Sequence, residues 1–268
     1  MIQGGPIWIS WSSDSEYLLA HANGQHFLVN NDTSNPIINL GLFSNAYNVP
    51  PWKPDKHAIL LSIQASNNQF KSFEVNLHES SDLQKNEDFI TRGSPSYLWS
   101  PNGKALAIGT KGRGILWKGK NLSVHNELKI RRELNLNIFE YISISDKIIS
   151  FFWSPDDTKI AFIAMSEKPG IFSLATLDIE NELITHLIDF SPTNDQLTMF
   201  QFFDQYAHSH SVWSPDSKSL VLAGNVESEM KIINETSPST NYIIVVEANT
   251  PEAYKLIGTG EFATWSFR

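Results

Sequence analysis

The 268-residue chain contains no cysteine, and this absence excludes two kinds of site. No disulfide can form, and no metal site can be built from thiolates. The chain also lacks a run of about 20 apolar residues, the length that a membrane-spanning helix requires. Its first residues, 1–8, have neither a basic start nor an apolar stretch of signal-peptide length. We therefore expect no membrane span and no export signal within this chain.

Basic residues are scarce as well. The chain has 20 Lys and Arg against 29 Asp and Glu, a net charge of −9. Because phosphate binding depends on clustered basic side chains, nucleic acid is not an expected partner. One local exception is a basic cluster that we expect to form a solvated face. It consists of Lys118, Lys120, Lys129, Arg131 and Arg132.

Signatures of common enzymes are missing too. The sequence has no Gly-x-Ser-x-Gly elbow, no His-Glu-x-x-His helix, no phosphate-binding loop, no EF-hand and no dinucleotide fingerprint. The glycine-rich run Gly109–Gly114 lies between two expected strands, so it indicates a hairpin. The sequence therefore predicts a protein that is not an enzyme and carries no cofactor.

The chain does contain a repeated unit, Trp-Ser-Pro-Asp in its most complete form. Five full copies and a last, cut-off copy begin at Trp11, Trp52, Trp99, Trp153, Trp213 and Trp265. Successive copies start about 41 to 60 residues apart, which is too long for leucine-rich or ankyrin repeats. An apolar triplet follows each full copy, for example Leu220-Val221-Leu222. The constant place of the triplet predicts that the repeat tryptophans pack between neighbouring units.

Each unit predicts four strands. Pro at the second position of a four-residue turn, flanked by Ser and Asp or Asn, favours a tight turn between the first two strands. The Trp ends the first strand, the triplet forms the second, and short β-rich runs form the rest. In the third unit, the third strand is expected at Gly114–Trp117. Fourth strands are expected near Ile37–Leu40, Phe89–Thr91, Ile184–Ile188 and Tyr254–Ile257.

These units resemble the TolB-type, WD-like β-propeller repeat, from about Ile7 to Phe267. The resemblance implies an all-β propeller of four-stranded blades, with five repeat units plus a sixth innermost strand, in one domain spanning 1–268. In that family the Asp is usually followed by Gly, and here only Gly103 fits. The other four copies carry Ser15, Lys56, Asp157 and Ser217 at this place.

The resemblance also implies a function. Such a propeller would be a non-catalytic scaffold that binds another protein or a ligand through its loops and channel face. The family is commonly exported, whereas this chain would be cytoplasmic if complete, so the compartment stays open. An innermost strand at both ends leaves open a closed ring or a piece of a longer propeller. Unpaired edges at the ends would promote association, although the oligomeric state stays open.

A second functional class is a glycoside-active or lectin-like propeller with carboxylates around the central opening. Its candidate acids are Asp14, Asp55, Asp156 and Asp216. All four occupy the same turn position, where Asn102 stands in the third unit. This placement favours a turn-capping role for the acids over hydrolysis.

The candidate binding residues are Asp204, His208 and His210. They follow a long expected loop, Asp189–Phe203, and precede a repeat Trp, so we place them on a first strand. Residues two apart on a strand share a face, so the two imidazoles would point the same way. The hypothesis is that they line the channel mouth and bind an anion or, with Asp204, a divalent metal. Two His on one strand make a weak metal site, so no metal is predicted.

Overall fold

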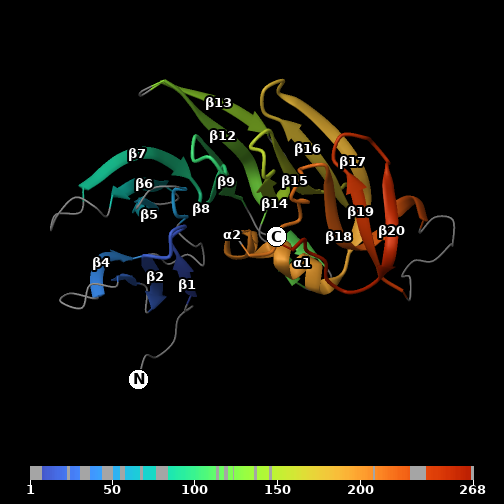
Figure 1. Ribbon diagram of the computed structural model, residues 1–268, viewed down its shortest axis with the longest axis horizontal. Coiled ribbons are helices and arrows are strands. Elements are labelled where there is room, and N and C mark those ends of the chain that lie inside the picture. Colours follow the sequence, from blue (N-terminus) through green and yellow to red (C-terminus); the bar gives the residue numbers. More distant parts are fainter. Residues whose placement is uncertain are drawn as a thin grey trace.

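The structure is a computed structural model that describes residues 8–22, 25–30, 37–43, 51–54, 58–66, 69–76, 84–112, 115–117, 120–122, 124–135, 138–144, 147–207, 209–229 and 240–266. Antiparallel strands dominate it, as the repeat predicts. Figure 1 shows them fanned around a common centre, with β1–β4 at one end of the fan and β20 at the other. Within the described residues no sheet closes on itself.

The first two units form separate sheets. Unit 1 consists of β1 (Trp8–Trp11), β2 (Tyr17–Ala22), β3 (Gln25–Asn30) and β4 (Ile37–Phe43), paired in that order. Unit 2 consists of β5 (Ala58–Ser66), β6 (Gln69–Asn76) and β7 (Gln84–Arg92), with Trp52 joined to Ile59 by a single bridge. The apolar triplets lie on β2 and β5, so the expected second strands are confirmed.

Units 3 to 5 share one eleven-stranded sheet. Unit 3 consists of β8 (Pro95–Trp99), β9 (Ala105–Lys111), β12 (His125–Asn135) and β13 (Ile138–Ile144). Unit 4 consists of β14 (Ile148–Trp153), β15 (Lys159–Met165), β16 (Phe172–Asp178) and β17 (Leu183–Pro192). Unit 5 consists of β18 (Ser219–Val226), β19 (Tyr242–Glu247) and β20 (Tyr254–Thr259), with Trp213 bridged to Leu220.

The third unit differs from the prediction. Ile115–Trp117 is β10, which pairs only with β11 (Lys120–Leu122) in a separate two-stranded sheet. β9 pairs with β8 on one side and on the other with β12, which is eleven residues long, so Gly114–Trp117 is not the third strand of this unit. The predicted hairpin at Gly109–Gly114 is also wrong, because β9 and β10 do not pair with each other. A β-rich run alone cannot show which of two strands joins the sheet.

The prediction of a loop at Asp189–Phe203 is also wrong. β17 continues through Pro192, and the chain then forms α1 (Asn194–Gln201) and α2 (Phe203–Tyr206). Thr193 caps α1, since its hydroxyl accepts a hydrogen bond from the Gln196 backbone N–H at 3.1 Å. α1 contacts β14 and β18, and α2 contacts β8, so the helices cover the inner strands near the centre of the fan (Figure 1).

Apolar side chains fill the spaces between neighbouring units. Leu19 and Leu28 of unit 1 pack with Ile59, Leu61 and Trp52 of unit 2. Strand alternation sends Leu60 to the other face, where it packs with Trp99 and its neighbours in unit 3. A larger cluster joins units 3, 4 and 5 with α1 and α2. A sheet that lies between two neighbouring units therefore buries both of its faces.

Candidate binding groove

One turn is repeated in four units and positions the residues of the candidate groove. In unit 4, the Ser154 hydroxyl donates to Asp156 Oδ1 at 2.7 Å and accepts from the Lys159 backbone N–H at 2.9 Å. The same Oδ1 accepts from the Thr158 N–H at 3.1 Å. Equivalent bonds join Ser12 to Asp14, Ser100 to Asn102 and Ser214 to Asp216. The Ser-Pro-Asp sequence therefore forms a self-bonded turn.

These bonds confirm the turn-capping role for three of the four repeated acids. Asp55 lies outside the described residues. Burial opposes ionisation of Asp156, but the hydrogen bonds from Ser154 and Thr158 outweigh it and lower the pKa of this carboxyl. The pKa of Asp216 is also lowered, first by its hydrogen bond from Ser214. Both carboxylates are thus held in their ionised form by their own turns.

The residue after the acid adopts a left-handed backbone whether or not it is glycine. Its φ is 63° at Ser15, 69° at Gly103, 62° at Asp157 and 58° at Ser217. Two of the non-glycine residues use their side chains to bind the preceding unit. Asp157 Oδ1 accepts from the Asn102 N–H at 2.8 Å, and the Ser217 hydroxyl accepts from the Asp156 N–H at 3.1 Å. These contacts help to offset the backbone strain.

The repeat tryptophans link consecutive units through their indole N–H groups. Trp52 Nε1 donates to the Ser10 carbonyl at 3.2 Å, Trp153 to Leu98 at 3.0 Å and Trp213 to Phe152 at 2.9 Å. In each case the acceptor precedes the Trp of the preceding unit. The expected packing between units is confirmed for Trp52, Trp99 and Trp213, which are 8%, 9% and 1% exposed. Trp11 is the exception, at 59% exposed.

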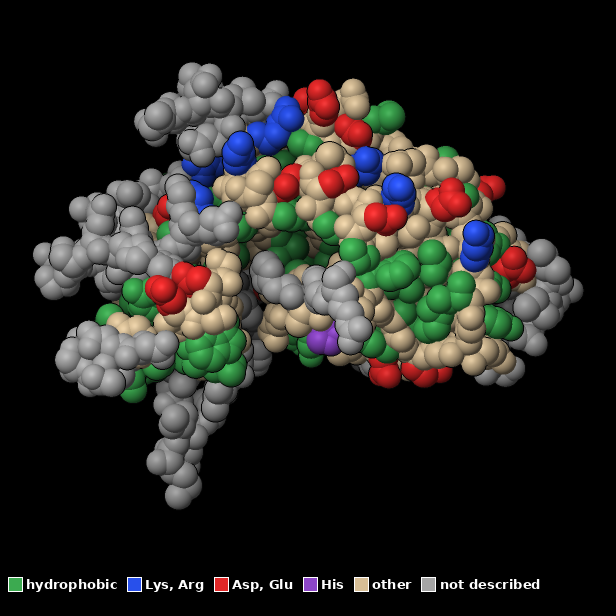
Figure 2. Space-filling model, viewed as in Figure 1, with side chains coloured by type: hydrophobic (Ala, Val, Ile, Leu, Met, Phe, Trp, Pro, Cys, Tyr) green, Lys and Arg blue, Asp and Glu red, His purple; other side chains and the backbone are tan. Residues whose placement is uncertain are grey.

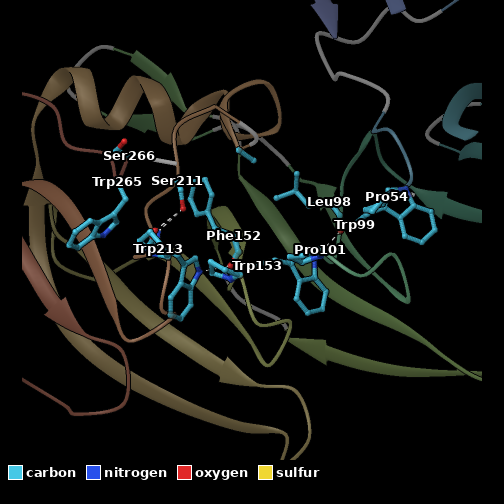
Figure 3. Close-up of a pocket in the computed structure, with 13 residues that line it drawn as sticks. Pro54, Leu98, Trp99, Pro101, Phe152, Trp153, Ser211, Trp213, Trp265 and Ser266 are labelled. Atoms are coloured by element: carbon cyan, nitrogen blue, oxygen red, sulfur yellow. Dashed lines mark hydrogen bonds between the residues drawn. The ribbon is translucent and has the colours of Figure 1, made fainter. Parts of the chain in front are cut away.

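These tryptophans and the turn prolines bring several units to one apolar groove of about 580 Å³. Figure 3 shows Trp99, Trp153, Trp213 and Trp265 in a row along it. Its lining is Pro54, Leu98, Trp99, Pro101, Phe152, Trp153, Pro155, Ala207, Ser211, Trp213, Pro215, Trp265 and Ser266. Figure 2 shows apolar side chains at the bottom of a hollow in the centre of the face in view. The repeat thus creates much of the groove, because units 3, 4 and 5 each contribute the repeat Trp and the turn Pro.

A second hollow, about 650 Å³ in volume, lies between units 3 and 4 and is polar. Its lining includes Asp156, Asp157, Asp178 and Glu180 together with the basic residues Lys104, Lys159 and Arg132. Burial raises the pKa of Asp157, although the Asn102 N–H opposes the rise. Among the repeated acids that the structure describes, only Asp156 lines this hollow.

Of the three residues predicted as a site, the structure describes Asp204 and His210, and it does not place them on one strand. Asp204 lies on α2 and is 9% exposed, so the predicted strand is a helix at this point. His208 lies outside the described residues. His210 follows α2 in a bend, where its Nδ1 lies 2.8 Å from the Ser209 hydroxyl and its ring packs on Tyr206 and Phe262. The described residues contain no group of three His, Cys, Asp or Glu side chains that could hold a metal.

The predicted basic face is only partly described. Lys118 and the side chain of Lys120 lie outside the described residues. Lys129 pairs with Glu127 at 3.3 Å, whereas Arg131 is 8% exposed and faces inward. Lys129 and Arg131 share one face of β12, whereas Arg132 lies on the other face, and Arg131 is buried, so the described cations do not form one solvated surface.

Comparison with known proteins finds similarity in structure only. No model of a known protein family matches the chain, and no curated protein matches its sequence. Among solved structures, TolB from Acinetobacter baumannii superposes with a TM-score of 0.51 at 14% identity, over 92% of this chain and 55% of that one. A putative TolB from Agrobacterium tumefaciens gives 0.45 at 10% identity, over 96% and 83%. Hydrazine synthase from Kuenenia stuttgartiensis gives 0.47 at 15%, over 89% and 62%.

The chain has the fold of a TolB-type β-propeller. The expected all-β class with a propeller-like arrangement of antiparallel sheets is therefore confirmed, whereas the number of blades and the closure of the ring remain predictions. The chain spans about half the length of the Acinetobacter TolB structure that it matches. Within the described part of the propeller, no helix is long and apolar enough to cross a membrane.

Two groups of functional interest in the propeller were not predicted. One is a buried cluster around His125, whose Nδ1 lies 3.3 Å from the Ile148 carbonyl and whose Nε2 lies 3.3 Å from the Ser96 hydroxyl. Burial, with a smaller contribution from the Lys111 charge, lowers the pKa of His125 to about 4. Burial also lowers the pKa of Lys111, against the opposing charge of Asp204. Only the fold brings these residues together, so no sequence motif marks them.

The other group is centred on Gln196, which is fully buried on α1. Its Oε1 accepts hydrogen bonds from the backbone N–H groups of Ala223 and Ala263, both at 3.1 Å. The side chain thereby ties α1 to β18 and to the last described segment of the chain. α1 and that segment both lie beside the groove residues, so Gln196 helps to hold one wall of the groove in place.

Proposed function

We propose that this propeller is a non-catalytic scaffold that binds an extended, apolar segment of another protein in the groove formed by its repeat tryptophans and prolines. The observation that carries the proposal is the composition of this groove. Its volume of about 580 Å³ lies within the usual range for ligand sites, about 300–1,000 Å³. Serine is the only polar residue in its lining.

The hydrogen-bonding capacity of the lining favours an apolar occupant. The indole N–H groups of Trp153 and Trp213 already donate to backbone carbonyls within the chain. The Ser211 hydroxyl donates to the Trp213 carbonyl at 2.9 Å. The groove therefore offers mainly aromatic and proline surface, which contributes to binding by burial and stacking. Aromatic-lined grooves of this kind suit proline-rich segments, which lose little conformational entropy on binding.

The charge of the chain indicates the character of the partner. A net charge of −9 attracts a basic partner and repels an acidic one. We therefore expect a segment that places proline or aliphatic side chains in the groove and basic residues outside it.

The alternative, a glycoside-active propeller, requires carboxylates free to act on a sugar. Asp14, Asp156 and Asp216 each use one carboxylate oxygen to hold their own turn. The repeated acids therefore have a structural role that accounts for their presence in these three turns. The polar hollow between units 3 and 4 is where this alternative would have to be tested.

The test is selection from a displayed library of short random peptides, followed by fluorescence anisotropy with the selected peptides. We expect enrichment of proline and aliphatic residues. Pro155→Glu places a charge on an exposed part of the groove wall and should weaken binding at least about tenfold. The matched control is Pro251→Glu, also in an exposed turn but outside the groove, which should bind as the wild type does.

The result that would overturn the proposal is equal binding by both proline variants, or no enrichment of apolar peptides. A parallel screen against an oligosaccharide array tests the alternative. Sugar binding that is lost in Asp157→Asn, which alters the polar hollow, and kept in Pro155→Glu would favour the glycoside-active class instead.

A further inference from the structure

The indole N–H groups along the groove are not all used within the chain. Those of Trp153 and Trp213 donate to carbonyls of the preceding unit. The Nε1 atoms of Trp99 and Trp265 are also buried, but no described residue accepts a hydrogen bond from them. Figure 3 shows these two side chains on either side of the bonded pair, and all four line the groove. The groove therefore combines two indoles fixed by hydrogen bonds with two that are not.

The repeat shows which bonds these two indoles lack. Following the pattern of the other units, Trp99 and Trp265 would donate to the carbonyls of Pro51 and Val212. Those carbonyls accept backbone N–H groups of β5 and β18 instead, at 3.2 and 2.8 Å. Lys53 lies over one face of the Trp99 ring, 4.7 Å from its centre, and leaves the N–H edge unused. No hydrogen bond to a neighbouring unit therefore prevents these two rings from turning.

The side chains of the groove offer hydrogen-bond donors and almost no acceptors. Proline, leucine, phenylalanine and alanine side chains form no hydrogen bonds, and an indole only donates. The Ser211 hydroxyl is used twice, since it donates to the Trp213 carbonyl at 2.9 Å and accepts from the Trp213 backbone N–H at 3.1 Å. Among the lining side chains, only the Ser266 hydroxyl is left as an acceptor. The groove thus suits an occupant that accepts hydrogen bonds and donates few.

A proline-rich segment has this property. Proline keeps its backbone carbonyl but has no N–H, and the polyproline II helix forms no internal hydrogen bonds, so its carbonyls need outside donors. A buried N–H without an acceptor is unfavourable, so an occupant that supplies the acceptor gains affinity. We propose that the Trp99 and Trp265 indoles turn in the groove and donate their N–H groups to two backbone carbonyls of a bound proline-rich segment.

This inference rests on the proposed function and narrows the choice of occupant. An aliphatic peptide without proline would bring backbone N–H groups for which the lining side chains have almost no acceptor. A hydrocarbon chain would bring no acceptor for the two indoles. Only the proline-rich segment matches both properties of the groove.

The first experiment follows the indole N–H groups in ¹⁵N–¹H NMR spectra of tryptophan-labelled wild-type protein, with the indole cross-peaks assigned residue by residue. A proline-rich peptide from the peptide selection is added. The Trp99 and Trp265 indole protons should move downfield and exchange more slowly with solvent, because they gain an acceptor. The Trp153 and Trp213 protons should move less, because their acceptors lie within the chain.

The second experiment compares folded variants by fluorescence anisotropy. Trp99→Phe and Trp265→Phe each keep an aromatic ring, remove the N–H and should weaken binding of the peptide about tenfold. The matched control is Trp11→Phe, the same change at a repeat position outside the groove lining, which should bind as the wild type does. The apolar dye N-phenyl-1-naphthylamine has no carbonyl, so Trp99→Phe should weaken its binding much less. This comparison separates the loss of the N–H from the loss of ring surface.

Three results would overturn the inference and leave the proposed function standing, provided that the peptide still loses affinity in Pro155→Glu. One is that the two indoles without acceptors shift no more than the bonded pair. Another is that both groove variants bind the peptide as Trp11→Phe does. The third is equal binding of a peptide in which leucine replaces every proline. A wild type that binds no apolar or proline-rich peptide overturns the proposed function and this inference together.

Discussion

The repeat tryptophans offer a direct measurement of what holds the units together. Trp213 and Trp11 occupy the same position in units 5 and 1, but Trp213 is 1% exposed and Trp11 is 59% exposed. Replacing each with alanine removes the same atoms from two different environments. The difference between the two variants therefore reports the contribution of the contact between units.

The expected loss of unfolding free energy in Trp213→Ala follows from the burial of the side chain and from one hydrogen bond. A buried tryptophan replaced by alanine costs about 3–5 kcal/mol of unfolding free energy, which includes the cavity left behind. The Trp213 indole also donates to the Phe152 carbonyl at 2.9 Å, and a buried carbonyl without its donor costs about 1–3 kcal/mol more in unfavourable cases. Trp11→Ala should cost less than about 1 kcal/mol in the monomer, because its side chain keeps most of its contact with water.

The assay is urea unfolding followed by circular dichroism, at a protein concentration low enough to prevent association. Trp213→Phe adds a second step, since it keeps an aromatic ring in the contact but removes the indole N–H together with part of the ring surface. We expect its loss of stability to lie between those of the two alanine variants. Equal midpoints for Trp213→Ala and Trp11→Ala would refute the reasoning, because they would mean that burial between units does not stabilise the fold.

Three further predictions concern polar groups. Ser154→Ala should lower the unfolding free energy by about 1–2 kcal/mol, because the Lys159 N–H loses its acceptor. Asp156→Asn should change the unfolding free energy very little, because Asn102 makes the same bonds in unit 3. Chemical denaturation compares the two variants. Gln196→Leu should cost about 2–4 kcal/mol by leaving two buried N–H groups without an acceptor, and hydrogen exchange at Ala223 should rise with it. The pKa of His125 is lowered to about 4, so the unfolded chain takes up a proton near pH 6.5 before the folded chain does. The stability present above pH 6.5 should therefore be lost as pH falls towards about 4, by up to about 3 kcal/mol, and His125→Asn should flatten this dependence in melts at several pH values.

The sequence predicted the blades because each blade depends on local signals. Trp11, Trp99 and Trp153 end their first strands, as the repeat indicates, and the Ser-Pro-Asp turn follows. The turn forms from bonds within six residues, from Ser154 to Lys159 in unit 4. Such short-range chemistry is readable from one sequence. Even the missing glycines do not disturb the turn, because Asp157 and Ser217 adopt the left-handed backbone and bind the unit before them.

The parts that were predicted wrongly depend on contacts distant in sequence. β10 has the composition of a blade strand, but β9 pairs with β12, which begins after the inserted hairpin. The segment after β17 was predicted as a loop from its turn residues, yet Leu197, Phe200 and Phe203 bury one side of it against the inner strands. Its helical pattern becomes informative only once the apolar surface of the inner strands is known.

The same dependence explains why the predicted site and the observed groove differ. The pair His208 and His210 attracted notice because imidazoles bind ligands, and its geometry was derived from a strand that the chain does not form. The groove residues Trp153 and Trp213 were read as structural, because every unit repeats them. They are structural through their indole N–H groups and yet line the groove through their rings. A repeat that places the same side chain at one end of successive blades builds a surface there, so Trp99, Trp153 and Trp213 both define the fold and line the groove.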